Sequence, residues 1–406
     1  MITLRNVLCW FAAFCLTLPA IALADDDEFN HLLPDQAIVQ LSRGVDPNAF
    51  ASEHNATVLR ALSGPNIALL GLDSERDDDE ELRALLDDDD VLWGEQYFTD
   101  QAPEARPRYF FTSTDGLPQI VDAPALPEGL EFTPASACST GASVIVAVLD
   151  TGVDISHPAL ADNVLPNGIN MLDATYDVRD DGDNHDDDND GQVDEMVGHG
   201  THVAGSILQI APDAMILPVK VLSSDGSGDT FSVMAGIIYA VEQGAQVINL
   251  SLGSTHDSRA IQGAVDFATN RDVIVVAAAG NGDRENPVEY PAAFSGVISV
   301  ASTTANADKA EYSNYHETVD ISAPGNNLAS SFPEGRYTTA SGTSMSVPLV
   351  TGAAALILER QPDLQSDQVA ELLKTSSGPL SLSNPIVDGK LGAGELNIDS
   401  LLSCSL

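Results

Sequence analysis

The chain has 406 residues, 44% of them hydrophobic, so it is long and apolar enough to form one large domain and a smaller companion. It carries 61 acidic and 17 basic residues, and its net charge of −44 repels nucleic acids and anionic membranes, which are therefore not expected partners. The many carboxylates are potential ligands for hard cations such as Ca²⁺.

The N-terminus has the pattern of an export signal. Arg5 gives a positive start, residues 7–18 are almost continuously apolar, and Ala22-Leu23-Ala24 supplies the small-x-small pattern that precedes cleavage. A membrane anchor is the alternative, but the apolar stretch is short and acidic residues follow it at once. We predict a signal peptide at residues 1–24 and a secreted protein, extracellular or periplasmic, that is soluble after processing.

Cysteine usage agrees with export. Cys9 and Cys15 would leave with the signal, so Cys138 and Cys404 remain. In an oxidising compartment these two are expected to form one disulfide, and two buried thiols are the alternative.

Residues 25–105 differ from the rest of the chain by their acidic runs. Strand-like segments at 37–41 and 67–72 alternate with helical patterns at 47–54 and 80–86. A strand-helix-strand-helix-strand order predicts a small α+β unit. The proline-containing stretch 101–107 separates this unit from the remainder.

From residue 143 onward, apolar runs alternate with helical patterns. The runs are rich in Val and Ile and lack polar alternation, which is typical of parallel strands that are covered on both faces. They lie at 143–149, 215–222, 247–250, 273–278 and 297–301, with helical spacing at 231–243 and 258–270. The pattern predicts an α/β fold with a doubly wound, mostly parallel sheet, in which ligands bind at the carboxyl ends of the strands.

Three short motifs follow element ends in this predicted sheet. Asp150 ends a buried strand in the segment VLDTG, His199 opens a helix in GHGTHVAG, and Ser344 opens another in GTSMSVP. Each alone is compatible with a turn or a helix cap. Together they supply a serine nucleophile, an imidazole that takes its proton and a carboxylate that orients the imidazole. A helix N-terminus also favours negative charge beside Ser344.

The three motifs resemble those of the subtilisin family of serine proteases, and they occur in that family's order of Asp, His and Ser. Further segments are similar to family sequences in the same order, and the resemblance spans residues 106–402. These segments are DGSG at 225–228, NLSLG at 249–253, AAAGN at 277–281, YPAAF at 290–294 and APG at 323–325.

The resemblance implies roles for further residues. Asn281 matches the side-chain donor of the oxyanion hole, which acts together with the main-chain N–H of Ser344. Two segments match the edges between which a substrate strand inserts, and a third matches one wall of the primary pocket, whose small residues imply broad specificity with an apolar preference. The two edge segments are Gly226, Ser227 and Gly228, and Ser251, Leu252 and Gly253. The pocket wall is formed by Ala278, Ala279 and Gly280.

The N-terminal unit resembles the ferredoxin-like propeptide of the family, notably at residues 37–41 and 93–97. The resemblance implies that residues 25–105 assist folding, inhibit the enzyme intramolecularly and are removed by self-cleavage. The catalytic domain would then be residues 106–406, and we expect a monomer that acts on polypeptides. A retained, independent acidic domain is the alternative.

Metal binding is expected at an unusual place. Ala159 stands where the family has a calcium-binding Asp, and residues 207–212 lack the loop that completes that site. An acidic run before the histidine motif instead resembles the first half of an EF-hand loop, although its twelfth position is Val197. The predicted Ca²⁺ ligands are Asp186, Asp188, Asp190, Gln192 and Asp194, and a solvated acidic insertion is the alternative.

The leading hypothesis is therefore a serine endopeptidase that needs no cofactor for its chemistry. A catalytically silent relative that binds peptides or Ca²⁺ is the first alternative, but it would tend to lack one of Asp150, His199, Asn281 and Ser344, and all four are present. An esterase or lipase is the second. Its nucleophile should lie in a Gly-x-Ser-x-Gly turn, which this chain does not have around Ser344.

Overall fold

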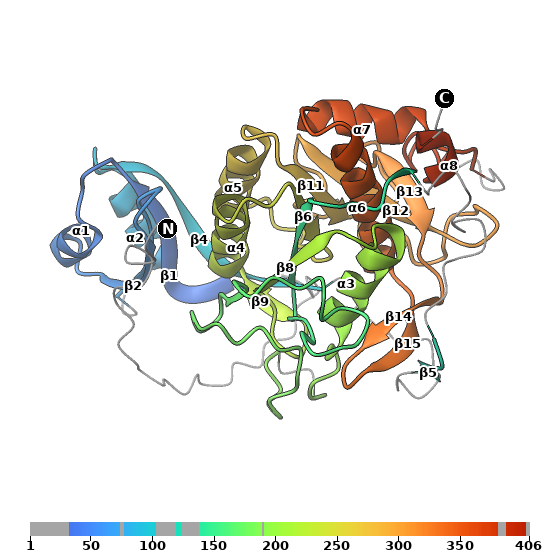
Figure 1. Ribbon diagram of the computed structural model, residues 1–406. Helices are drawn as coiled ribbons and strands as arrows, with labels where there is room; N and C mark the ends of the chain where they lie inside the picture. Colours follow the sequence, from blue (N-terminus) through green and yellow to red (C-terminus); the bar gives the residue numbers. More distant parts are fainter. Residues whose placement is uncertain are drawn as a thin grey trace. The chain divides into compact units, whose positions relative to one another are not determined.

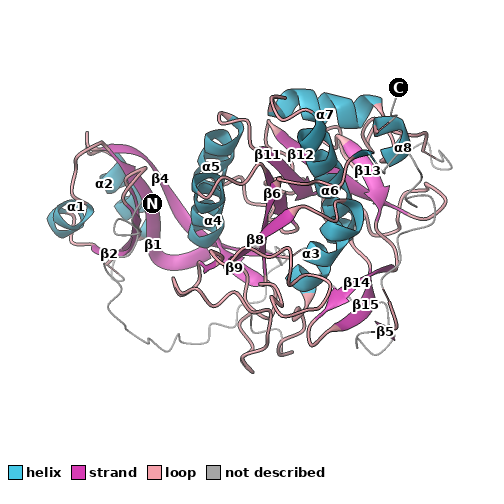
Figure 2. Ribbon diagram, in the orientation of Figure 1, coloured by secondary structure: helices cyan, strands magenta, loops and turns pink. Residues whose placement is uncertain are grey.

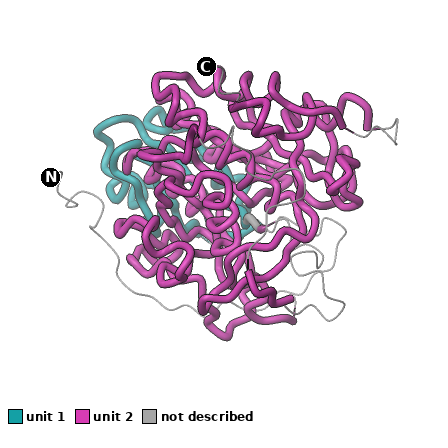
Figure 3. The backbone as a smooth tube through the Cα atoms, turned by 45° about the vertical axis from the view of Figure 1, so that its right-hand side comes forward, with its two compact units in different colours: residues 1–99 teal, residues 100–406 magenta. Residues whose placement is uncertain are grey.

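The computed structural model describes residues 32–73, 77–102, 119–123, 138–188, 191–380 and 387–402. The chain divides into two compact units, Met1–Thr99 and Asp100–Leu406, which Figure 3 colours separately. The predicted signal peptide, residues 1–24, and Cys404 lie outside the described residues. Within the described ranges, no helix combines the length and apolar character that crossing a membrane requires.

The first unit is an antiparallel sheet with two helices (Figure 1). β3 pairs with β1 and β2, and β1 also pairs with β4. Alternate residues of β1, Ala37, Val39 and Leu41, are buried against Phe50 and Leu85 of the helices. The elements run in the order β1 Leu32–Leu41, α1 Pro47–Glu53, β2 Thr57–Leu62, β3 Ile67–Gly71, α2 Asp78–Leu86 and β4 Val91–Gln101. This is the α+β arrangement expected from the sequence, with β2 as a strand that was not predicted.

The second unit is built on a seven-stranded sheet in the order β13-β12-β11-β10-β6-β8-β7. All of its pairings are parallel. The strands are β6 Ile145–Asp150, β7 Ile169–Asn170, β8 Met215–Lys220, β10 Val247–Leu250, β11 Ile274–Ala278, β12 Val297–Thr303 and β13 Ile321–Pro324. The predicted doubly wound parallel sheet is confirmed.

Helices cover both faces of this sheet, as the cyan and magenta elements of Figure 2 show. α4 Thr230–Glu242 and α5 Arg259–Thr269 pack together and contact β6, β8 and β11, whereas α3 His199–Ile210 and α6 Thr343–Arg360 form a second contacting pair. α6 runs along β6, β10, β11, β12 and β13, and sixteen of its residues are buried, from Thr343 to Leu358. The all-round apolar sequence of α6 explains its central place.

The chain order places a topological switch beside β6. β7 and β8, which follow β6 in the chain, extend the sheet on one side of β6. The next strand of this sheet, β10, pairs with the opposite edge of β6. In sheets of this kind the loops at the carboxyl ends of the strands around the switch form the binding site. Asp150, the last residue of β6, lies at that position.

Smaller elements complete the unit. β14 Leu328–Phe332, β15 Arg336–Ala340 and β5 Gln119–Val121 form a three-stranded antiparallel sheet, and β14 packs against α3. β9 Ser227–Asp229 precedes α4, and α7 Ser366–Thr375 and α8 Ile398–Leu401 follow α6.

Residues 138–141 are attached to the C-terminal part of the second unit. Cys138 is disulfide-bonded, and its Sγ atom lies 3.6 Å from the carbonyl oxygen of Leu402. Its predicted partner, Cys404, lies outside the described residues, so this pairing stays a prediction. Nearby, the carboxylate of Glu359 in α6 accepts hydrogen bonds from the Ser139 hydroxyl at 2.6 Å and from the Thr140 and Gly141 N–H groups at 2.6 and 2.7 Å.

Candidate active site

Asp150 and His199 meet at the carboxyl edge of the sheet. The Nδ1 atom of His199 lies 2.6 Å from Oδ1 of Asp150, and both side chains are fully buried. The carboxylate also accepts the N–H of Thr151 at 2.7 Å. This contact fixes the imidazole ring and leaves its Nε2 atom as the one that can exchange a proton with another group.

Gly200 allows this close approach. A Cβ atom at Gly200 would lie 2.1 Å from the carbonyl oxygen of Gly152 and 3.0 Å from Cβ of Asp150. Only a residue without a side chain lets the first turn of α3 come so near to the end of β6. The Gly-His-Gly sequence is therefore a packing requirement of the Asp150–His199 contact.

Ser344 is the second residue of α6 and is buried. Its hydroxyl donates a hydrogen bond to the carbonyl oxygen of Ser251 at 3.2 Å, and the hydroxyl of Ser251 donates to the carbonyl oxygen of Ser344 at 2.9 Å. These reciprocal bonds attach the start of α6 to the segment that follows β10. Because α3 and α6 pack together, His199 and Ser344 open two neighbouring helices on the same side of the sheet.

Asn281 is held by the residue that precedes Ser344. Its Oδ1 atom accepts both the N–H and the hydroxyl of Thr343, each at 2.9 Å. The amide oxygen is thus turned toward the start of α6, so the amide nitrogen, the donor end of the group, points away from it.

The loop that carries Asn281 is held by Asn314. The side-chain oxygen of Asn314 accepts the N–H groups of Gly282 and Arg284 at 2.9 and 3.2 Å, and its nitrogen donates to the carbonyl oxygen of Ala279 at 2.9 Å. The N–H of Asn314 also donates to the carbonyl oxygen of Gly280 at 2.9 Å.

Lys309 fixes the same region from the other side. Its ammonium group lies 2.7 Å from Oδ1 of Asp283 and donates to three main-chain carbonyl oxygens, those of residues 310, 311 and 313, at 2.9, 3.1 and 2.8 Å. The lysine side chain is only 12% exposed. Charge-assisted bonds of this kind are stronger than neutral ones.

The predicted substrate-binding segments lie at strand ends. Ser227 and Gly228 belong to β9, directly after Gly226, while Ser251, Leu252 and Gly253 follow β10. Ala278 ends β11, and Ala279 and Gly280 follow it. The carbonyl oxygen of Gly226 accepts the N–H of Ala102, which belongs to the same compact unit, at 2.8 Å.

A partly buried ion pair adjoins the predicted pocket wall. Glu289 is 5% exposed, and Oε1 accepts a hydrogen bond from Nη2 of Arg284 at 2.8 Å. The glutamate side chain packs on two of the predicted segments. A Cβ atom added at Gly280 would lie 2.5 Å from its Cγ, and a Cβ atom added at Gly253 would lie 3.5 Å from its Oε2. A cavity beside Ala279 is lined by Glu285, Glu289 and His316 among others. The region is therefore more polar than its small residues alone indicated.

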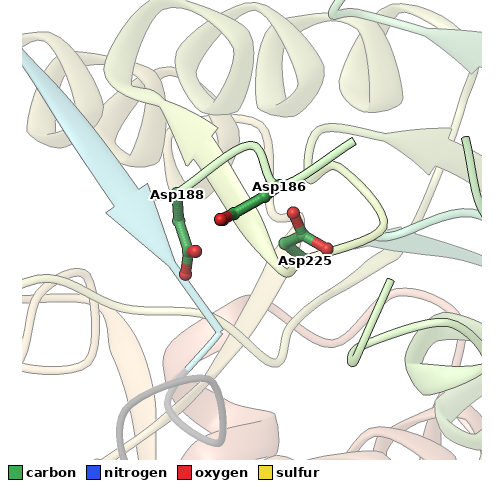
Figure 4. Close-up of side chains that lie close together, drawn as sticks. All are labelled: Asp186, Asp188 and Asp225. Carbon is green, nitrogen blue, oxygen red and sulfur yellow. The ribbon is translucent and has the colours of Figure 1, made fainter. Parts of the chain in front are cut away.

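The acidic run gathers around a residue from another loop. Ligand oxygens of Asp186, Asp188 and Asp225 all lie within 4.8 Å of one another, and Figure 4 shows the three side chains. Asp225 is fully buried and accepts the N–H groups of Asp187 and Asp194. Burial raises the pKa of Asp187, and the negative charges of Asp183 and Asp225 raise it further. Three hard oxygen donors in mutual repulsion are a set that fits a divalent cation such as Ca²⁺.

Asp194, another predicted ligand, is not one of the three clustered carboxylates. The Asp194 carboxylate accepts the N–H groups of Asp183 and Asn184 at 2.9 and 3.2 Å, which stabilises the turn before the acidic run. Gln192 is exposed and Asp190 lies outside the described residues, so their roles as ligands stay predictions.

Sequence reasoning missed several of these residues. In the sequence, Asp225 is only the start of the DGSG segment, because an Asp beside a Gly indicates a turn and not a ligand. Thr343 lies within the serine motif, but the motif alone indicates no role for it. Asn314 and the Arg284–Glu289 pair stand in no recognisable local pattern.

Comparisons with known proteins agree with this arrangement. Residues 141–394 match the model of the subtilase family. Thermitase from Thermoactinomyces vulgaris is 39% identical over 258 residues, 61% of this chain and 83% of thermitase. Subtilisin Savinase from Lederbergia lenta is 36% identical over 284 residues, 67% and 98% of the two chains. The major intracellular serine protease of Bacillus subtilis is 40% identical over 257 residues, 59% and 77%.

Solved structures give the same result for the fold. Fervidolysin from Fervidobacterium pennivorans, described as a keratinolytic enzyme related to subtilisin, aligns with a TM-score of 0.74 and 22% identity over 94% of this chain, which spans 62% of fervidolysin. A protease from Pseudoalteromonas arctica aligns with a TM-score of 0.61 and 29% identity over 74% and 100% of the two chains. The protein belongs to the subtilase family and is a serine endopeptidase of the subtilisin type.

Proposed function

We propose that this endopeptidase cleaves peptide bonds through an acyl-enzyme formed on Ser344, with His199 as general base and Asp150 as its orienting partner. The single observation that carries the proposal is the fully buried 2.6 Å contact between His199 Nδ1 and Asp150 Oδ1. It keeps the proton on Nδ1, so Nε2 is available to accept the proton of a serine hydroxyl, and it stabilises the imidazolium that results.

The chemical steps follow from these roles. Ser344 Oγ bonds to the scissile carbonyl carbon while its proton passes to His199 Nε2. The C–N bond then breaks as His199 returns that proton to the leaving amine, and water hydrolyses the acyl-enzyme by the same sequence. Asn281 and the main-chain N–H of Ser344 would donate hydrogen bonds to the oxyanion, and the Thr343 bonds to Asn281 Oδ1 support this orientation of the amide.

The substrate would bind as an extended strand between two segments, Gly226 to Gly228 and Ser251 to Gly253. Main-chain hydrogen bonds would give affinity, and pockets for alternate side chains would give selectivity. We propose broad specificity with an apolar preference before the scissile bond, beside Ala278, Ala279 and Gly280. Arg284 supports this preference because it neutralises the Glu289 carboxylate next to that wall.

The chain would be made as a secreted, inactive precursor. Residues 1–24 would direct export, and residues 25–105 would act as an intramolecular inhibitor that the enzyme removes itself. The hydrogen bond from Ala102 to Gly226 supports this proposal, because it is a main-chain contact between the end of the proposed propeptide and a proposed substrate-binding segment.

A Ca²⁺ ion would be structural. Asp186, Asp188 and Asp225 would hold it, and the ion would supply positive charge that relieves their repulsion. Binding to the folded state alone would raise stability as the ion concentration rises. The test uses Ser344→Ala protein, which cannot digest itself: its Tm should fall on chelation and recover with Ca²⁺, and Asp225→Asn should abolish the difference. An unchanged Tm would contradict the proposal.

The catalytic proposal is tested with Ser344→Ala, compared with wild type in N-terminal processing and casein hydrolysis. Ser344→Ala should remain unprocessed and inactive. Ser346→Ala is the matched control, since Ser346 lies in the same helix and is buried, but its hydroxyl donates to the carbonyl oxygens of residues 323 and 324. Equal processing and hydrolysis in Ser344→Ala and wild type would overturn the assignment.

A further inference from the structure

Asp180 is a buried carboxylate beneath the start of α3 that the proposed mechanism does not use. It is 3% exposed and lies nineteen positions before His199 in the sequence. Its two oxygens accept four hydrogen bonds. Oδ1 accepts the Gly198 N–H at 2.9 Å and the Thr151 hydroxyl at 3.0 Å. Oδ2 accepts the N–H and the hydroxyl of Thr201 at 2.9 and 2.6 Å.

These bonds provide the cap that α3 cannot supply for itself. The N-cap residue is Gly198, which has no side chain to accept the N–H groups of the first turn. Asp180 accepts two of these main-chain donors from a distant part of the chain. Its negative charge at a helix N-terminus also interacts favourably with the helix dipole.

The same carboxylate reaches the end of β6. The Thr151 hydroxyl donates to Asp180 and accepts the N–H of Gly200 at 3.0 Å, while the Thr151 N–H donates to Asp150. Thr151 thus directly follows Asp150, and Gly198 directly precedes His199, the two residues that form the 2.6 Å contact. Asp180 is bonded to both neighbours and so sets the spacing between strand end and helix start.

The four contacts suit the ionised form of Asp180, because each partner can donate to a carboxylate oxygen. Two of the four partners are main-chain N–H groups, which can only donate, whereas the two threonine hydroxyls could also accept a proton from a neutral carboxyl group. Burial raises the pKa of Asp180 above its usual value, and its hydrogen bonds and the positive charge of Lys220 offset this rise only in part. The ammonium of Lys220 donates to the carbonyl oxygen of Thr151, so a cation lies close to the same network.

We propose that Asp180 is a positioning residue for catalysis: its buried carboxylate holds the start of α3 and the residue after Asp150 in one network, and thereby fixes the His199–Asp150 geometry. This inference rests on the proposed roles of His199 and Asp150. Proton transfer depends steeply on such geometry, since small misplacements of catalytic groups cost large factors in rate.

The test compares Asp180→Asn with wild type. The amide has almost the same shape but presents an NH₂ group to donors that need an acceptor, so the network is broken without a cavity. We expect kcat to fall by at least about tenfold, with KM changed little because no substrate-binding segment is touched. The low-field proton resonance of the His199–Asp150 hydrogen bond should shift or broaden. Asp181→Asn is the matched control, because Asp181 is exposed and pairs only with Arg179 on the surface; it should behave as wild type.

A second pair of variants keeps the test decisive if Asp180→Asn folds poorly. Thr151→Val removes the hydroxyl that joins Asp180 to β6, and Thr151→Ser retains it, so only the valine variant should lose kcat. Wild-type kcat and an unchanged low-field resonance in both Asp180→Asn and Thr151→Val would overturn the inference.

These outcomes are separate from failure of the proposed function. If Ser344→Ala stays fully active, the catalytic assignment fails whatever Asp180→Asn does. If Ser344→Ala is inactive while Asp180→Asn equals wild type, only the positioning role fails. Labelling of Asp180→Asn by a serine-directed sulfonyl fluoride, compared with wild type, reports how far Ser344 is still activated.

Discussion

The main-chain N–H and the hydroxyl of Thr343 both bind the side-chain oxygen of Asn281, each at 2.9 Å. The residue directly before the proposed nucleophile therefore orients the proposed oxyanion donor. One short segment, Thr343-Ser344, thus contributes to both halves of the acylation site. The hydroxyl of Thr343 also accepts the Gly280 N–H at 3.2 Å, which extends the network to the proposed pocket wall.

Thr343→Val should lower kcat by about tenfold, because Asn281 keeps its main-chain partner but loses the hydroxyl, a loss of about 1.4 kcal/mol of transition-state stabilisation. Thr343→Ser keeps the hydroxyl and should lose much less. Asn281→Ala should be more severe, and loss of the equivalent donor in subtilisin itself costs roughly 10²–10³ in kcat. Steady-state kinetics on a peptide p-nitroanilide measure all three. Equal kcat for the valine and serine variants would argue against the hydroxyl's role.

Gly200→Ala should inactivate the enzyme and lower its Tm. The added Cβ would lie 2.1 Å from the Gly152 carbonyl oxygen, so α3 must move away from Asp150. Gly263→Ala is the control, since Gly263 lies within α5 and an added Cβ there meets nothing within 4 Å. That variant should gain roughly 0.5–1 kcal/mol of stability from helix propensity and keep full activity. Thermal unfolding in the Ser344→Ala background and kinetics in the wild-type background check both.

Arg284→Gln should shift the substrate preference toward basic side chains before the scissile bond. The change removes the cation that pairs with Glu289 at 2.8 Å and leaves the carboxylate charge beside Gly280 and Gly253. We expect the ratio of kcat/KM for Lys over Phe substrates to rise by about tenfold, or about 1.4 kcal/mol. Adding Glu289→Gln should reverse the shift. An unchanged ratio would place the ion pair outside the primary pocket.

Glu359 should make stability depend on acid pH. Burial tends to raise its pKa, but hydrogen bonds from Ser139, Thr140 and Gly141 outweigh this effect, so the pKa lies below the ordinary value of a glutamate. Because the pKa of Glu359 is lower in the folded than in the unfolded state, the ionised group stabilises the fold at pH values above its unfolded-state pKa. This stabilisation is lost as the pH falls through the folded-state pKa. In the Ser344→Ala background, Glu359→Gln should therefore lower Tm most near neutrality, and the difference should disappear well below pH 4.5. A Tm difference independent of pH would refute this.

The sequence predicted the sheet and the proposed catalytic residues because each stands in a local pattern. Asp150, His199 and Ser344 directly follow or open elements whose apolar composition is visible in the sequence. β2 was missed because its residues alternate between exposed and partly buried, so it contains no continuous apolar run. Its pairing with β3, rather than its own composition, makes it a strand.

Residues that act across long distances were beyond local patterns. Asp225 joins Asp186 and Asp188 only because the turn before β9 comes close to the acidic run, thirty-eight positions from its contact with Asp187. Asp180 stands among several similar aspartates, and burial alone distinguishes it from the exposed Asp181. Such roles depend on which carboxylate the fold removes from water, and a sequence of like charges does not encode that choice locally.

The ammonium of Lys309 contacts four oxygen atoms, one of a carboxylate and three of main-chain carbonyl groups. Because this positive charge is tethered to the chain, dilution or a chelator cannot remove it, and its local concentration is set by the covalent link. The loop that carries Asn281 should therefore keep its shape in media that would remove Ca²⁺ from the site proposed at Asp186, Asp188 and Asp225. We expect ion depletion to shorten the working lifetime of the enzyme before it reduces the rate of each turnover.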